Sequence, residues 1–167
     1  MTEGGGDGRG GQARPVSFAG AAMTRDACLC LHAQRAARAL ARRFDEAFRP
    51  FGLTNSQFSL MMALNQPQPP TIGAVAAVLG ADRTTLTAAL KPLERRGLVR
   101  AAADAKDRRA RRLALTAEGQ ALLARALATW QEAHAALEAA LAAAGHDADA
   151  LRGGLNALAG RNGAPPP

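Results

Sequence analysis

The sequence predicts a mainly α-helical protein with a small β-hairpin, and three observations support that fold class. Apolar residues recur at steps of three and four over most of the 167 residues, which is typical of amphipathic helices. Residues that favour helix N-termini, among them Thr54, Thr71 and Asp82, precede these segments. Two short segments with strand character, 98–100 and 111–115, enclose a charged turn, which indicates a hairpin.

The two ends of the chain lack apolar periodicity. Residues 1–23 are rich in glycine and residues 161–167 in proline, so we expect a flexible N-terminal arm and a flexible tail. Residues 24–160 are expected to form a single domain. No segment approaches the roughly 18 to 20 apolar residues that a membrane span needs, and two cysteines are too few for a disulfide framework. We therefore expect a cytoplasmic protein.

The first long helix is expected between residues 24 and 50, with Thr24 as its N-cap and Gly52 after its end. Its apolar side chains form one stripe. The stripe consists of Cys30, Ala33, Ala37, Leu40, Phe44 and Phe48. A second helix is expected over residues 54–65, because the closely spaced prolines at 67–70 cannot continue it.

Two short helical segments follow at 72–79 and 83–96, and Gly80 lies in the tight turn between them. This order is that of a helix-turn-helix, whose second helix enters the major groove of DNA. Pro92 predicts a kink or a loosened turn in that second helix. The hairpin comes directly afterwards and is expected to be a wing, so residues 53–115 are predicted to form a winged helix-turn-helix. An arginine at the tip of such a wing can enter the minor groove.

A last long helix is expected from Thr116 onward, over about 29 residues or roughly 43 Å. Its apolar side chains follow a heptad pattern. The pattern consists of Leu123, Leu127, Trp130, His134, Leu137 and Leu141. Because this helix is longer than a small winged domain can cover, we expect it to pack against the first helix and a second subunit. Residues 24–52 and 116–160, including a short final helix from Asp147, are therefore predicted to be dimerisation helices.

The positive charge is concentrated in one part of the chain. The net charge is +7, and residues 83–112 carry ten basic residues against three acidic ones. A solvated surface usually mixes the two signs more evenly, so this window favours a surface that binds phosphates. Within it, Arg83, Thr84, Thr85 and Thr87 are suited to contacts with phosphates and base edges. The alternative is that the threonines only cap the helix and face solvent.

The order of these elements and four short motifs resemble the MarR family of bacterial winged helix-turn-helix regulators. The motifs are Leu53-Thr54 with Gln57-Phe58, Asp82 to Thr87, Pro92 to Val99, and Asp107-Arg108-Arg109 followed by Leu115-Thr116 and Gly119. The resemblance covers about residues 28–160. It implies a homodimer on a pseudo-palindromic operator, with one recognition helix per half-site.

The resemblance also implies which residues meet the DNA. It places Arg109 at the wing tip, with Asp107 orienting it. The predicted DNA-binding residues are Arg83, Thr84, Thr85, Thr87, Lys91, Asp107, Arg108, Arg109 and Arg111.

Members of this family respond to aromatic ligands, to metals or to oxidants, and the sequence offers candidates for two of these. A pocket for a small aromatic effector can be built from Phe44, Phe58, Met61, Met62 and Trp130, although the same spacing also suits a plain core. His32, His134 and His146 are scattered, so we expect neither a metal site nor a cofactor. The alternative is a soft metal ion held across a dimer by Cys28, Cys30 and His32.

Cys28 and Cys30 are the candidate oxidant sensors. The position of Cys30 resembles that of the reactive cysteine in the organic-hydroperoxide branch of the family (OhrR). That branch supports its cysteine with tyrosines, whereas this chain has none and carries Gln34 and Phe44 at those positions. Two residues apart on one helix, the thiols would point away from each other, so a disulfide would join subunits or elements. The alternative is that both cysteines are small packing residues.

The predicted function is a dimeric transcriptional regulator of double-stranded DNA, a repressor released by a small aromatic effector or by cysteine oxidation. The alternative is an architectural DNA-binding protein that tolerates any sequence. We expect no enzymatic activity, because no nucleophile with its base, no phosphate-binding loop and no metal-ligand cluster is recognisable.

Overall fold

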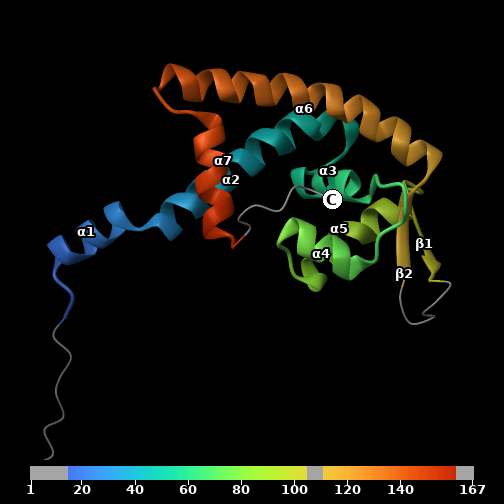
Figure 1. Cartoon of the computed structure of the whole chain (residues 1–167), viewed down its shortest axis with the longest axis horizontal. Helices are drawn as coiled ribbons and strands as arrows, with labels where there is room; N and C mark the ends of the chain where they lie inside the picture. Colours follow the sequence, from blue (N-terminus) through green and yellow to red (C-terminus); the bar gives the residue numbers. More distant parts are fainter. Residues whose placement is uncertain (1–14, 105–110, 161–167) are drawn as a thin grey trace, which may run out of the picture. The chain divides into compact units, whose positions relative to one another are not determined.

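The computed structural model describes residues 15–104 and 111–160 (Figure 1). The predicted fold class is confirmed, because the described residues are mainly helical and contain a two-stranded antiparallel sheet. The chain divides into two units, residues 1–39 and residues 40–167. None of the described helices is long and apolar enough to cross a membrane.

The first unit contains helix α1 (Phe18–Ala27) and the start of α2 (Leu29–Phe48). Residues 18–23, expected in a flexible arm, are therefore helical. The N-cap is Ser17 rather than Thr24, because the Ser17 hydroxyl accepts a hydrogen bond from the Gly20 amide at 3.1 Å. The expected single helix is also interrupted at Cys28, whose backbone is extended (φ −76°, ψ 102°).

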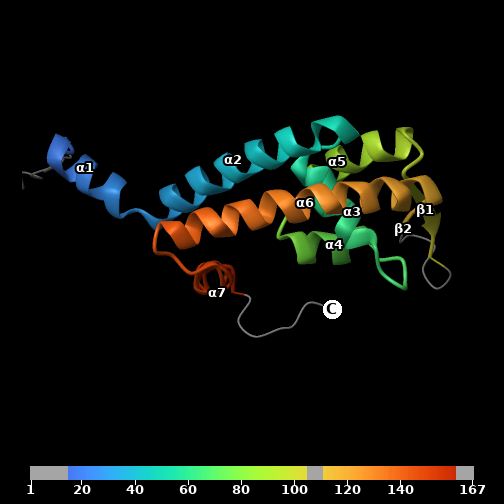
Figure 2. The same ribbon diagram turned by 90° about the horizontal axis from the view of Figure 1, so that it is seen from above.

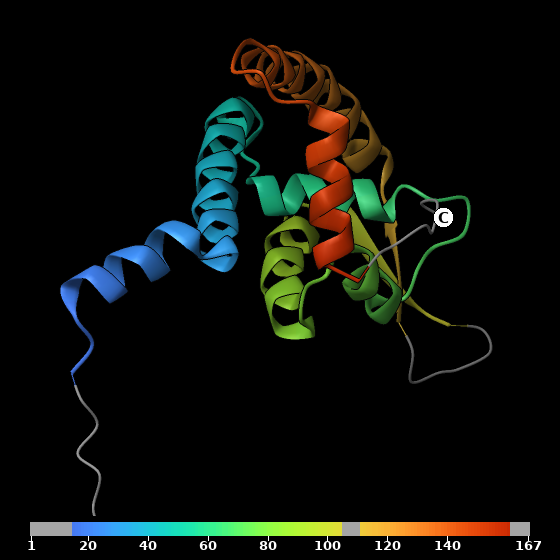
Figure 3. The ribbon, with the colours of Figure 1, turned by 60° about the vertical axis from the view of Figure 1, so that its left-hand side comes forward.

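The second unit begins with the rest of α2 and the short 3₁₀ helix η1 (Arg49–Phe51), after which Gly52 adopts a left-handed conformation at φ 61°. Helix α3 (Asn55–Leu64) starts at the predicted N-cap Thr54, which forms a capping box with Gln57. Helix α3 is central, because it contacts α4 (Ile72–Leu79), α5 (Arg83–Arg95) and α6 (Ala117–Ala143) (Figure 3).

Aromatic rings join the end of α2 to α3. The buried ring of Phe48 stacks on Phe58 with 4.4 Å between centroids and lies 6.0 Å from Phe44. Leu93 of α5 and Met61 of α3 are completely buried in the same core. Burial of such side chains contributes about 1.5–3 kcal/mol each, so this core holds the helix-turn-helix in place.

The helix-turn-helix forms as predicted. Thr71 caps α4, Gly80 provides the left-handed turn at φ 60°, and Asp82 caps α5. Helix α5 continues through Pro92 to Arg95.

The hairpin consists of β1 (Val99–Ala103) and β2 (Arg111–Leu115), so the first strand is longer than predicted. Its register pairs Val99 with Leu115 and Ala103 with Arg111. One face buries Val99, Leu113 and Leu115 against the core, which leaves the opposite face for polar side chains.

The junction between the hairpin and α6 is unusually close. Thr116 donates from its amide to the Leu98 carbonyl (3.0 Å) and from its hydroxyl to the Gly97 carbonyl (2.7 Å). The same hydroxyl caps α6 by accepting from the Gly119 amide at 3.0 Å. A Cβ atom on Gly119 would lie only 2.0 Å from the Leu98 carbonyl oxygen. Only glycine therefore allows α6 to approach the start of the hairpin this closely.

Helix α6 runs for 27 residues and begins beside the hairpin (Figure 2). Its fully buried residues, Gly119, Leu122, Leu123 and Ala126, all lie in its first three turns. The predicted heptad residues farther along are only half-buried. The N-terminal part of α6 thus belongs to the core, and the remainder keeps apolar side chains partly open to solvent.

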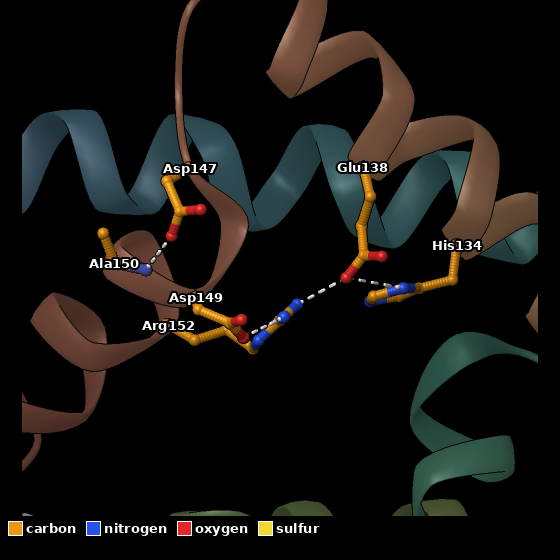
Figure 4. Close-up of polar contacts among 6 residues, drawn as sticks. All are labelled: His134, Glu138, Asp147, Asp149, Ala150 and Arg152. Atoms are coloured by element: carbon orange, nitrogen blue, oxygen red, sulfur yellow. Dashed lines mark hydrogen bonds and ion pairs between the residues drawn. The ribbon is translucent and has the colours of Figure 1, made fainter.

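Helix α7 (Ala148–Leu158) starts at Asp147, as predicted, and a polar cluster joins it to α6 (Figure 4). Arg152 donates to the Glu138 carboxylate at 2.7 Å, and His134 Nδ1 lies 3.5 Å from the same oxygen. The His134 ring stacks on Trp130. The leucines of α7, in contrast, are exposed.

Candidate nucleic-acid interface

One face of α5 carries basic side chains at helical spacing. Arg83, Thr87 and Lys91 follow one another at intervals of four residues, which places them on a single stripe. The same three residues border two hollows, of about 610 Å³ and 320 Å³, on the surface of the helix-turn-helix. They therefore form a ridge between two concave surfaces, which we call the α5 ridge.

The larger hollow brings further positive charge to the α5 ridge. Arg111 of β2 and the first turn of α4, at Thr71 and Gly73, line its walls. The N-terminus of a helix presents unpaired amide groups and a partial positive charge, which suit a phosphate. Among the described residues, Arg83, Lys91 and Arg111 form no ion pair with a carboxylate. Glu94 also lines the larger hollow, so this surface carries an excess of positive charge rather than positive charge alone.

The three threonines of α5 differ in how their hydroxyl groups are used. Thr85 donates to Asp82 at 2.7 Å as part of the N-cap, and Thr87 donates to the Arg83 carbonyl at 2.7 Å. Within the described part of the chain, the Thr84 hydroxyl is exposed and has no such bond. Capping thus accounts for part of the threonine pattern, and Thr84 is the member best placed to donate to a ligand.

The N-cap of α5 is sensitive to protonation. The Thr85 hydroxyl and then its amide donate to the Asp82 carboxylate, which lowers the pKa of this carboxyl. A lowered folded-state pKa means that the cap stabilises the protein above the unfolded-state pKa and loses this effect as the pH falls through the folded value.

Two arginines of the basic window form hydrogen bonds with other parts of the protein, although Arg96 is exposed and Arg112 is only half-buried. Arg96 donates to the carbonyls of Gly52 (2.6 Å) and Phe51 (3.0 Å), so it fastens the end of α5 to the turn after α2. Arg112 pairs with the buried carboxylate of Asp104. The sequence does not reveal this use of Arg96 and Arg112, because their partners are distant in the chain or in another element.

The predicted wing residues Asp107, Arg108 and Arg109 lie outside the described residues. Arg111 is the one predicted wing residue that the structure places, and it is exposed beside the α5 ridge.

Three of the five residues predicted to form the effector pocket line one cavity in the structure. Phe58, Met62 and Trp130 line a mainly apolar cavity of about 440 Å³ between α3, α4 and α6, together with Asn65 and Gln66. Phe44 and Met61 do not line it and belong to the buried core.

The two cysteines lie where α1 ends and α2 begins. Cys28 is half-buried in the extended linker, and its sulfur accepts from the Leu31 amide at 3.4 Å. Cys30 is exposed, and its sulfur accepts from the Gln34 amide group at 3.3 Å. Because Cys28 is not helical, the expectation that both thiols share one helix is wrong. Among the described residues, no group of three or more potential metal ligands gathers.

These elements define a class of protein. A helix that presents a basic ridge, supported by a preceding helix and followed directly by a hairpin, is a winged helix-turn-helix, and this fold binds DNA.

Comparison with known proteins leads to the same class. The MarR family model matches residues 51–110. The DNA-bound Mycobacterium tuberculosis transcriptional regulator MosR is 39% identical, with 78% of this chain and 92% of MosR covered and a TM-score of 0.70. The transcriptional repressor CouR, bound to a 23-mer DNA duplex, is 31% identical, with 81% of this chain and 95% of CouR covered and a TM-score of 0.71.

A curated relative from Bacillus subtilis, the uncharacterized HTH-type transcriptional regulator YwoH, is 31% identical over 86 residues. This match spans 52% of the chain and 62% of YwoH. The chain belongs to the MarR family of winged helix-turn-helix transcriptional regulators. Its named relatives are regulators rather than enzymes.

Proposed function

We propose that this protein is a dimeric, cytoplasmic repressor that binds a pseudo-palindromic operator, with one α5 helix in the major groove of each half-site. The observation that carries this proposal is the α5 ridge of Arg83, Thr87 and Lys91, with Arg111 beside it. The DNA complexes of MosR and CouR support the same role.

The residues divide into two groups in this proposal. Arg83, Lys91 and Arg111 neutralise phosphates, and Thr84 and Thr87, which line the smaller hollow, face base edges. Thr85, predicted to do the same, uses its hydroxyl in the N-cap of α5. By resemblance to the family, Asp107, Arg108 and Arg109 belong to a wing that reaches the minor groove.

Dimerisation is proposed to use the apolar side chains that α6 and α7 leave open. Leu151 and Leu155 are each 47% exposed and Leu158 is 68% exposed, and their spacing places them on one face of α7. A second copy of the chain would cover this face and the half-buried part of α6.

Footprinting on the DNA that flanks the protein's own gene tests this function. We expect protection of an inverted repeat at protein concentrations that leave random DNA unprotected. Protection no stronger than on random DNA would instead favour the architectural alternative.

We propose that the cavity beside Trp130 receives a small aromatic effector that releases the repressor. The cavity is mainly apolar, with Ser59, Asn65 and Gln66 as its polar residues, a composition typical of ligand pockets. It adjoins α4, so a bound ligand would act directly on the helix-turn-helix.

The sequence provides a clean assay, because Trp130 is the single tryptophan and there is no tyrosine. We expect benzoate or cinnamate to change the Trp130 fluorescence and to weaken operator binding over the same concentration range. Met62→Glu, at the cavity, should suppress both effects by repelling the carboxylate, whereas Ala128→Glu, on an exposed position of α6, should preserve them. A fluorescence change without loss of operator binding would show that the cavity does not control DNA release.

Oxidation of Cys28 or Cys30 is the alternative route of release, favoured by the exposure of the Cys30 thiol. We would titrate operator binding with an organic peroxide in the wild type, in Cys28→Ser and in Cys30→Ser. Loss of the peroxide response in a variant would assign the sensing to that thiol. Equal responses in all three proteins would remove both cysteines from the mechanism.

A further inference from the structure

We propose that Arg112 is a positioning residue: it joins the hairpin to the loop ahead of α4 and does not contact DNA. This inference rests on the proposed function of operator binding. It gives Arg112 a different role from its neighbour Arg111, which is proposed to contact a phosphate, although both residues belong to β2.

The Arg112 guanidinium reaches two different parts of the chain. Its Nε atom donates to the Asp104 carboxylate at the end of β1, and its Nη1 atom donates to the Pro69 carbonyl at 2.8 Å. Arg112 itself lies in β2, opposite Ala102 of β1. One side chain therefore connects both strands of the hairpin with the loop that leads into α4. We call this set, Arg112, Asp104 and Pro69, the wing clamp.

The loop needs donors from outside because of its composition. Pro67, Pro69 and Pro70 have no amide hydrogen, so the loop is rich in carbonyl acceptors and poor in donors. The hairpin supplies the missing donors, from Arg112 to Pro69 and from the Leu113 amide to Pro70 (2.9 Å). An isolated bridge between Thr71 and Arg112 adds a backbone contact at the N-cap of α4. The position of the hairpin is thus linked to the start of the helix-turn-helix.

The positive charge of the wing clamp has a carboxylate partner, whereas the basic residues of the α5 ridge form no ion pair among the described residues. Asp104 is only 6% exposed, and a buried carboxylate requires a charged or hydrogen-bonding partner. Arg112 is one such partner: its side chain is 41% exposed, but its positive charge is compensated by contact with this carboxylate. A phosphate of DNA would have to compete with a carboxylate already in contact with the guanidinium.

The two neighbouring arginines also face opposite sides. Successive side chains of a strand point to opposite faces of the sheet. Arg111 lines the hollow beside α5, whereas Arg112 lines a separate cleft of about 390 Å³ with Asp104 and Pro69. Arg111 is therefore on the side of the α5 ridge, and Arg112 is not.

The test compares Arg112→Met, Asp104→Asn and Arg111→Met in operator binding over a range of salt concentrations. Arg111→Met should reduce the slope of log K against log salt by about 0.9, the value for one lost phosphate contact. Arg112→Met should weaken operator binding about ten-fold, the size of one specific contact, with an unchanged slope. Asp104→Asn should also weaken binding, although it makes the protein more positive. The double variant Arg112→Met/Asp104→Asn should bind the operator no more weakly than whichever of these two single variants binds more weakly.

Two results would overturn the proposal: a fall of the salt slope in Arg112→Met equal to that in Arg111→Met, or tighter binding by Asp104→Asn. If Arg112→Met does not fold, Arg112→Lys retains the charge but not the forked contact, and it should still bind more weakly than the wild type. A wild-type protein without preference for an operator would instead contradict the proposed function. The role of the wing clamp in holding the hairpin would then be tested by amide hydrogen exchange in β1 and β2. Arg112→Met should accelerate this exchange, and Arg111→Met should not.

Discussion

Replacement of Gly119 by alanine is expected to lower the free energy of unfolding by about 2 kcal/mol. The new Cβ would lie 2.0 Å from the Leu98 carbonyl oxygen, so the backbone at the start of the hairpin or the first turn of α6 must shift. A contact this short with backbone places the overpacking cost at the upper end of its usual range, about 3 kcal/mol. Subtraction of the helix preference of about 1 kcal/mol that alanine has over glycine leaves a net loss of about 2 kcal/mol. Urea unfolding measures the difference.

Gly153 in α7 provides the matched control. A Cβ at this position meets no atom within 4 Å, so Gly153→Ala should raise the free energy of unfolding by about 0.5–1 kcal/mol. The same substitution thus has opposite signs at two helical glycines. If Gly119→Ala were also stabilising, the close approach between α6 and Leu98 would be contradicted.

Replacement of Arg83 by alanine is expected to weaken operator binding by about 1–3 kcal/mol, which is roughly a 5- to 150-fold rise in Kd. Arg83 is the first residue of α5 and borders both hollows of the helix-turn-helix, so its loss removes charge from the centre of the proposed interface. The slope of log K against log salt should also fall, because Arg83 is proposed to neutralise a phosphate.

Arg125→Ala is the control for net charge. Arg125 is exposed on α6, away from the residues that line the two hollows, so its removal should change Kd by less than about two-fold. Binding by Arg83→Ala that matched the Arg125→Ala variant would indicate that α5 is not the recognition helix.

The helix boundaries of the second unit were predictable because each depends on a local hydrogen bond. Thr54, Thr71, Asp82, Thr116 and Asp147 all cap the helices that they precede. In each case the cap accepts from an amide three residues away, so the cause and the effect lie in one short segment.

The start of the chain was less predictable, because two cap-like residues compete there. Ser17 and Thr24 both precede alanine-rich sequence, and periodicity alone does not decide between them. The interruption at Cys28 has no glycine or proline to mark it, and the bond from the Leu31 amide to the Cys28 sulfur is evident only in three dimensions.

The residue types of the interface were predictable, but their individual uses were not. A run of basic residues reveals neither that Arg96 serves two carbonyls nor that Arg112 serves Asp104 and Pro69. Pro69 lies 43 residues from Arg112 in sequence, so only the fold brings the two together. The same holds for Phe44 and Met61, whose apolar character suits a pocket wall and a core equally.

The junction built by Thr116 and Gly119 bears on how such proteins are recognised from sequence. These two residues belong to one of the four motifs of the family resemblance, yet they serve the approach of a helix to a hairpin and line neither hollow beside α5. This half of the motif, unlike the wing residues 107–109, identifies an architecture and carries no information about which bases are read. Two proteins can therefore share it completely and regulate unrelated genes.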